Sequence, residues 1–202
     1  MQLVTSLTSP FGRKLRIMLL EKGLPHELLK EAANTPGSRV PEFNPLGKVP
    51  ALVTDAGETL IESSVIAGYI ETLNVAPRFL PLDPLEAVRV RALEALADGV
   101  ADAGMLVFNE RQRPPELQSA AWIERQWTKV TRGLAALEAK AHGRTWLQGE
   151  AMTLADITLV CVLDWLDLRF AQEKIGETYP GLAAWAAPIA ARPSFRETEP
   201  PR

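Results

Sequence analysis

A change of pattern near residue 76 constrains the fold of this chain more than any other feature. Before it, short apolar runs of strand length alternate with amphipathic helical segments; after it, only helical patterns occur. The stretch Ala76–Pro84 carries three prolines in nine residues, so it cannot be helical throughout. We therefore predict an N-terminal domain over residues 1–76, a linker over 77–84 and an all-helical domain over 85–202.

The N-terminal segment predicts a small α/β domain. A strand at Gln2–Thr5, a helix ending near Gly23 and a strand at His26–Leu29 form a compact βαβ unit, whose strands should be parallel. Strands at Ala51–Thr54 and Thr59–Ile61 flank a turn containing a glycine and should form a hairpin, and a helix follows. The fold class is therefore α+β (βαβ-ββα) followed by an all-α bundle.

The second half predicts four helices, at Leu85–Glu110, Glu116–Ala141, Leu154–Phe170 and Pro180–Ala191. Pro188 should bend or shorten the last of them. Thr153 and Asp156 fit a variant capping box at the start of the third, a structural role without chemistry. Cys161 lies in the apolar run that follows, where a thiol is usually inert.

Composition excludes several classes of function. The net charge of −3 argues against nucleic acid as a partner, since no basic excess is present to neutralise phosphates. No apolar run approaches the roughly 18 residues of a membrane span, and we see no signal peptide. A single cysteine excludes an intramolecular disulfide, and two distant histidines give no metal-ligand spacing. We expect a cytoplasmic protein without a metal.

The first motif with possible chemistry is Thr8-Ser9-Pro10-Phe11. Proline suits the first position of a helix, and serine before it is a strong cap. The Ser9 hydroxyl would then stand at the positive end of a helix, where a thiolate gains from the dipole and from a donated hydrogen bond. The alternative is that Ser9 only caps the helix.

The second motif is the run Asn44–Val53, in which Pro50 directly precedes an apolar strand. An X-Pro bond can be cis at low cost. A cis Val49-Pro50 bond would turn the Val49 N–H and C=O outward, to pair with an extended peptide as in strand addition. The alternative is an ordinary trans loop proline before an edge strand.

The third motif is Glu62-Ser63 at the start of a predicted helix. Backbone N–H groups and the Ser63 hydroxyl could hold a carboxylate, and Glu62 could hold an ammonium group. Together they would suit the two charged ends of an amino acid. The alternative is a helix cap with an acidic first turn.

The order of these motifs resembles that of cytosolic glutathione transferases, most closely the bacterial members of serine type. A serine at a βα turn precedes Asn-Pro-x-Gly-x-Val-Pro, then Glu-Ser opening a helix, then a helical half with Thr-x-x-Asp. The resemblance covers essentially the full chain. It implies a thioredoxin-like N-terminal domain, a helical C-terminal domain, glutathione as co-substrate and a homodimer.

The resemblance also implies roles for individual residues. Ser9 matches the hydroxyl that activates the glutathione sulfur, and Pro50 matches the cis-proline of the family. Val49 matches the residue whose backbone pairs with the cysteinyl part. The remaining expected glutathione-binding residues are Phe11 in the serine motif, Lys48 for the glycyl carboxylate, and Glu62 and Ser63 for the γ-glutamyl end.

Alternatives stay open at this point. Thr8 is the rival of Ser9, which we prefer because it directly precedes Pro10. The absence of cysteine and tyrosine at this turn disfavours mixed-disulfide, thioredoxin-like and tyrosine-based mechanisms. A glutathione-dependent isomerase or dehalogenase on the same scaffold, or a non-catalytic binding or regulatory module, would share these residues.

The second substrate of a transferase would be a small, largely apolar electrophile. Ala101, Met105 and Phe108 share one face of the first long helix at helical spacing, and we expect them to contact it. The alternative for this stripe is ordinary core packing.

Overall fold

The computed structural model describes residues 1–33 and 35–201, which form two compact units. The first unit runs from Met1 to Leu80 and also includes the C-terminal segment from Arg192 onward. The second unit spans Pro81–Ala191. The predicted helical domain, 85–202, extends beyond the C-terminal end of this second unit, because the segment after residue 191 packs with the first unit. Residue 202 itself lies outside the described residues.

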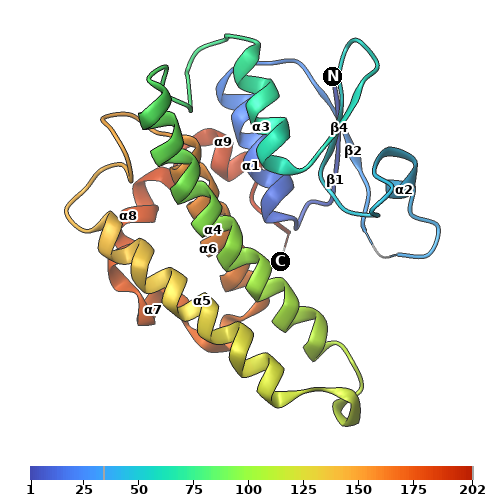
Figure 1. Cartoon of the computed structure of the whole chain (residues 1–202), viewed down its shortest axis with the longest axis vertical. Helices are drawn as coiled ribbons and strands as arrows, with labels where there is room; N and C mark the ends of the chain where they lie inside the picture. The colour runs from blue at the N-terminus through green and yellow to red at the C-terminus, as the bar shows by residue number, and fades with distance from the viewer. Residues whose placement is uncertain (34, 202) are drawn as a thin grey trace. The chain divides into compact units, whose positions relative to one another are not determined.

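The first unit contains a four-stranded mixed sheet in the order β2-β1-β3-β4. Figure 1 labels β1, β2 and β4 of this sheet. Strand β1 pairs parallel with β2 and antiparallel with β3, and β3 pairs antiparallel with β4. The elements are β1 (Gln2–Thr5), α1 (Pro10–Glu21), β2 (Glu27–Lys30), α2 (Val40–Phe43), β3 (Ala51–Val53), β4 (Thr59–Ile61), α3 (Ser63–Thr72) and α9 (Pro193–Glu197). The predicted parallel βαβ unit and the hairpin are confirmed.

The regular elements of the second unit are all helical, and its long helices α5 and α6 both pack on α4. Its elements are α4 (Pro84–Arg111), η1 (Pro115–Leu117), α5 (Ala120–Ala141), α6 (Leu154–Arg169), η2 (Ala171–Glu173), α7 (Ile175–Thr178) and α8 (Pro180–Ala190). The predicted fold class is confirmed. Pro188 lies inside α8, which continues for two more residues. No helix in the described part of the chain is long and apolar enough to cross a membrane.

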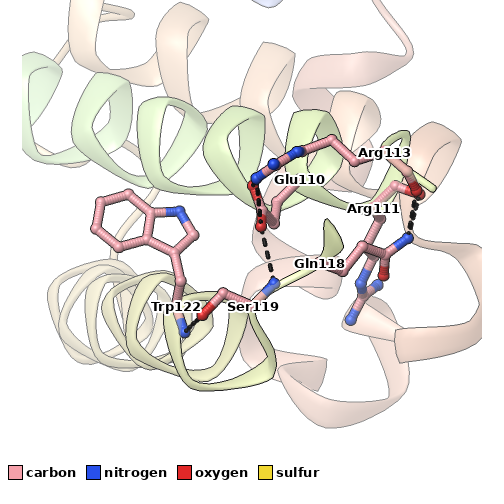
Figure 2. A network of polar contacts seen from close by, with 6 residues as sticks. All are labelled: Glu110, Arg111, Arg113, Gln118, Ser119 and Trp122. Atoms are coloured by element: carbon pink, nitrogen blue, oxygen red, sulfur yellow. Dashed lines mark hydrogen bonds and ion pairs between the residues drawn. The ribbon is translucent and has the colours of Figure 1, made fainter. Parts of the chain in front are cut away.

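The connection between α4 and α5 explains why α5 begins at Ala120 rather than at the predicted Glu116 (Figure 2). The Glu110 carboxylate accepts hydrogen bonds from Arg113, at 3.1 Å, and from the Ser119 N–H, at 2.8 Å. The Ser119 Oγ in turn accepts the Trp122 N–H at 3.3 Å. Ser119 is therefore the N-cap of α5, and the preceding prolines form only a short 3-10 turn.

The start of α6 carries the predicted capping box. Thr153 and Asp156 exchange the reciprocal bonds of the motif. The buried Asp156 carboxylate accepts from the Thr153 N–H at 2.6 Å, from the Thr153 hydroxyl at 2.7 Å, and from the Leu147 N–H at 2.7 Å. The last bond was not predicted, and it ties the preceding loop to the helix.

Candidate functional site

Ser9 is the N-cap of α1, as predicted. Its Oγ accepts the Gly12 N–H at 3.2 Å, and Pro10 occupies the first turn. The hydroxyl proton of Ser9 is not used in this bond, because the oxygen is the acceptor. Ser9 is buried, whereas its rival Thr8 and its neighbour Phe11 are half-buried. Ser9 therefore combines a helix terminus with a hydroxyl that can also donate.

Helix α1 approaches β1 closely because residue 12 has no side chain. A Cβ on Gly12 would lie 1.8 Å from the Oγ1 of Thr5 and 2.7 Å from its Cβ. Thr5 is fully buried in the strand that pairs with both β2 and β3. The position of Ser9 relative to the sheet thus depends on this glycine.

The loop before β3 is held by a buried asparagine. The Asn44 Nδ2 donates to the Lys48 carbonyl at 2.8 Å, and its Oδ1 accepts the Leu46 N–H at 2.9 Å. The Val49–Pro50 peptide bond is cis, as predicted. Val49 is half-buried and the Lys48 side chain is exposed. The loop is therefore defined by the side chain of Asn44, a contact that the sequence analysis did not identify.

Glu62 and Ser63 begin α3, and the backbone there is unusual. Glu62 has a φ of 71°, a conformation uncommon for residues other than glycine and often found at functional sites. Its carboxylate accepts the Ser63 N–H at 3.1 Å. The Ser63 Oγ is buried and has no hydrogen-bond partner among the described residues. A buried hydroxyl without a partner is a candidate for contact with a ligand.

Strand register brings the three motifs to one end of the sheet. Ala51 pairs with Val4 of β1 and with Ile61 of β4. The segment after β1, the Val49–Pro50 step before β3 and the Glu62–Ser63 step after β4 therefore leave the sheet at the same end. Helices α1 and α3 both begin there, so their positive N-terminal ends favour an anionic ligand.

The predicted second-substrate residues lie on α4 in the second unit. Ala101 is fully buried, while Met105 and Phe108 are half-buried. The guanidinium carbon of Arg169 lies 4.8 Å from the centre of the Phe108 ring. The burial of Ala101 fits core packing, so only Met105 and Phe108 keep surface with which to meet a ligand.

Metal-binding residues do not cluster in the part of the chain that the structure describes. No group of three or more His, Cys, Asp or Glu side chains there could hold a metal ion.

Two family models match the chain in the order of its units. The N-terminal domain of glutathione S-transferase matches residues 8–73, and the C-terminal domain matches residues 120–187. The chain belongs to the glutathione S-transferase family.

Relatives in this family match nearly the full length of the chain. The GST-like protein YibF of Escherichia coli is 45% identical over 100% of both chains. Maleylacetoacetate isomerase of Pseudomonas aeruginosa is 34% identical over 99% of this chain and 96% of its own. A crystal structure of a glutathione S-transferase from Methylobacillus flagellatus, with glutathione bound, has a TM-score of 0.95 at 37% identity and covers 99% of both chains.

Proposed function

We propose that this protein is a glutathione transferase that uses Ser9 and the N-terminus of α1 to stabilise the glutathione thiolate. The observation that carries the proposal is the register of the sheet, which gathers the three motifs at one end. The glutathione-bound relative supports glutathione as the peptide that occupies them.

Each part of glutathione has a matching group at this end of the sheet. The carboxylate of the γ-glutamyl part would accept a hydrogen bond from the Ser63 hydroxyl. The ammonium group of the same part would donate to the Glu62 carboxylate. The Val49 backbone would pair with the cysteinyl part, next to the cis Pro50. The exposed Lys48 would reach the glycyl carboxylate. Phe11, half-buried beside the serine, completes the proposed set.

Catalysis would follow from the position of the sulfur. The Ser9 hydroxyl donates to the sulfur while its oxygen accepts the Gly12 N–H, so the thiol loses its proton to solvent more readily. The thiolate then forms a carbon–sulfur bond with the electrophile, and the leaving group departs with the bonding electrons. Binding both reactants in one orientation supplies much of the rate. Met105 and Phe108 are the proposed contacts of the electrophile.

The decisive experiment compares Ser9→Ala with Ser9→Thr, which keeps a hydroxyl. A hydrogen bond to a charged group contributes about 1.5–3 kcal/mol, so kcat for a chlorodinitrobenzene-type substrate should fall roughly 10- to 100-fold in Ser9→Ala. Affinity for glutathione should stay similar, and Ser9→Thr should retain part of the rate. Thr8→Val serves as the control for the rival residue. Unchanged turnover in Ser9→Ala, with loss in Thr8→Val, would move the role to Thr8.

A glutathione-dependent isomerase is the second candidate, because a maleylacetoacetate isomerase matches nearly the whole chain. The two activities differ in stoichiometry. Conjugation consumes one glutathione per turnover, whereas isomerisation returns it. Incubation with maleylacetoacetate and a small amount of glutathione, followed by thiol titration, separates them. Failure to retain the protein on immobilised glutathione would instead favour a non-catalytic module.

We further propose that the protein is a cytoplasmic homodimer, as the family resemblance implies. Leu82 precedes α4, and Leu85 and Val88 lie near its start; the three residues are 76%, 58% and 62% exposed. If they form one continuous apolar patch, that patch is a candidate interaction surface. Replacing Leu85 and Val88 with glutamate should convert the dimer to a monomer in light-scattering measurements. A wild-type protein that is monomeric at all concentrations would remove this part of the proposal.

A further inference from the structure

The C-terminal segment Arg192–Thr198 lies along α1, the helix whose N-terminus carries Ser9 (Figure 1). This segment includes α9, and it reaches the first unit only after the chain has passed through the whole second unit. Phe195 and Thr198 are buried there, with 1% and 0% of their surface exposed. The segment is therefore an integral part of the first unit.

Near the N-terminal end of α1, the contacts run through Arg13. Its side chain is only 3% exposed; its Nε donates to the Thr198 Oγ1 at 3.3 Å and its Nη2 to the Phe195 carbonyl at 3.1 Å. The Arg13 backbone N–H donates to the Ser9 carbonyl at 2.9 Å. These bonds and one turn of helix connect Thr198 to Ser9.

One turn further along α1, Arg16 adds a second bond to the same residue. Its Nη1 donates to the Thr198 carbonyl at 3.4 Å. The Thr198 hydroxyl itself donates back to the Ser194 carbonyl at 2.8 Å. Thr198 is thus the point where two arginines of α1 meet the C-terminal segment.

At the other end of α1, an ion pair fixes the last residue of the helix. The Glu21 carboxylate accepts from the Arg192 Nε at 3.0 Å and Nη2 at 2.6 Å, and from the Ser194 hydroxyl at 2.5 Å. A two-pronged guanidinium–carboxylate contact constrains orientation as well as distance. With bonds at both ends, α1 can neither slide nor tilt without breaking contacts to the segment.

We propose that the segment Arg192–Thr198 positions the N-terminus of α1 against the glutathione sulfur, with Thr198 as its central positioning residue. The inference rests on the proposed function only in taking the sulfur to lie at this helix end. A misplacement of about 1 Å at a reacting centre can cost roughly 100-fold in rate. Contacts that fix the helix therefore act on catalysis without touching the substrate.

The test is Thr198→Val, which removes the hydroxyl and keeps the shape of the side chain. Thr158→Val is the matched control, because the Thr158 hydroxyl is also buried and also bonds back to a helix carbonyl, that of Leu154 at 2.7 Å, but in the second unit. The readouts are kcat, glutathione affinity and the pKa of the bound thiol. This pKa is measured from the ultraviolet absorbance of the thiolate as the pH is varied. Thermal unfolding is recorded in parallel.

Thr198→Val should lower kcat by about 10-fold and raise the pKa of the bound thiol. Thr158→Val should change neither value, even if the two variants unfold at the same temperature. Thr198→Ser, which restores the hydroxyl, should recover both values. Equal thiol pKa and kcat in Thr198→Val and the wild type would overturn the proposal. So would equal losses in Thr198→Val and Thr158→Val, because they would reflect stability alone.

If Thr198→Val does not fold, Arg192→Gln replaces it, since the Arg192 side chain is 40% exposed and tolerates substitution more easily. It should raise the thiol pKa in the same direction, and an unchanged value would overturn the proposal. Failure of the proposed function is recognised separately. A wild-type protein that binds no glutathione contradicts the proposed function. If Thr198→Val changes kcat and the pKa of the bound thiol while Ser9→Ala changes neither, helix positioning is supported without a role for Ser9.

Discussion

Gly12→Ala is expected to push α1 away from β1 and to reduce activity more than stability. The added Cβ would lie 1.8 Å from the Thr5 Oγ1 and 2.7 Å from the Thr5 Cβ. Rotation of the threonine side chain can move the first atom but not the second, which is fixed to the strand. Reaching an ordinary contact of 3.4 Å requires a shift of about 0.7 Å, and the helix must supply it because β1 is held on both sides.

The magnitudes of the two effects differ. Overpacking a core costs about 1–3 kcal/mol, and alanine in a helix gains about 1 kcal/mol over glycine, so the free energy of unfolding should fall by at most about 2 kcal/mol. A shift of 0.7 Å at Ser9, scaled from roughly 100-fold per ångström, should lower kcat about 25-fold. The loss of rate therefore exceeds what a small loss of stability explains.

The assay is glutathione conjugation with chlorodinitrobenzene, combined with urea unfolding. Gly99→Ala is the matched control, because its added Cβ meets no atom within 4 Å and the residue is also helical. It should leave kcat unchanged and raise the free energy of unfolding by up to about 1 kcal/mol. Adding Thr5→Ala to Gly12→Ala should restore only part of the rate, since the Cβ remains. Wild-type kcat in Gly12→Ala would refute the reasoning.

Three further predictions concern packing, a buried carboxylate and pH. Gly133→Ala should lower the free energy of unfolding by about 1–3 kcal/mol, because the added Cβ would lie 2.4 Å from the Val100 Cγ2. Adding Val100→Ala should remove the clash, and a double-mutant cycle of urea unfolding measures the coupling between the two substitutions. Asp156→Asn should cost about 2–4 kcal/mol in the same assay, since an amide nitrogen would face buried donors. Burial raises the pKa of Glu21, but bonds from Arg192 and a serine outweigh it and hold the pKa below the usual value of about 4.3. The pair should therefore stabilise the protein fully above that pH and lose its contribution as the pH falls through the lowered pKa, so the acid dependence of the melting temperature should become shallower in Glu21→Gln.

The strands of the first unit and the long helices of the second were predictable because local signals agreed with the final contacts. The proline-rich stretch after residue 76 separates two kinds of periodicity, and Gly57, with a φ of 81°, permits the turn of the predicted hairpin. The return of the chain at Arg192 was not predictable. It depends on bonds between Arg13 and Thr198, 185 residues apart, for which no local pattern exists.

The candidate site was predictable in its parts but not in its supports. The cap role of Ser9 follows from the preference for serine before a proline that begins a helix. For Pro50 the local sequence allowed both a cis and a trans bond, and the family resemblance favoured the cis bond that the structure has. The buried Lys22–Glu71 ion pair, at 3.0 Å, links the C-terminal ends of α1 and α3, yet neither residue type is normally buried. Proposed roles for individual site residues remain predictions that the variants above can test.

The discontinuity of the first unit has a consequence for how this protein folds. During synthesis, the strands and α1 emerge long before Thr198, so the helix must wait for the second unit before its last partner can close on it. The entropy cost of closing the long loop between Arg13 and Thr198 rises only slowly with loop length. A contact between residues so far apart in sequence nevertheless delays the completion of folding. A fragment ending at the linker should therefore expose the buried face of α1 and aggregate, and cutting the protein between its two units would not yield an independent thioredoxin-like domain.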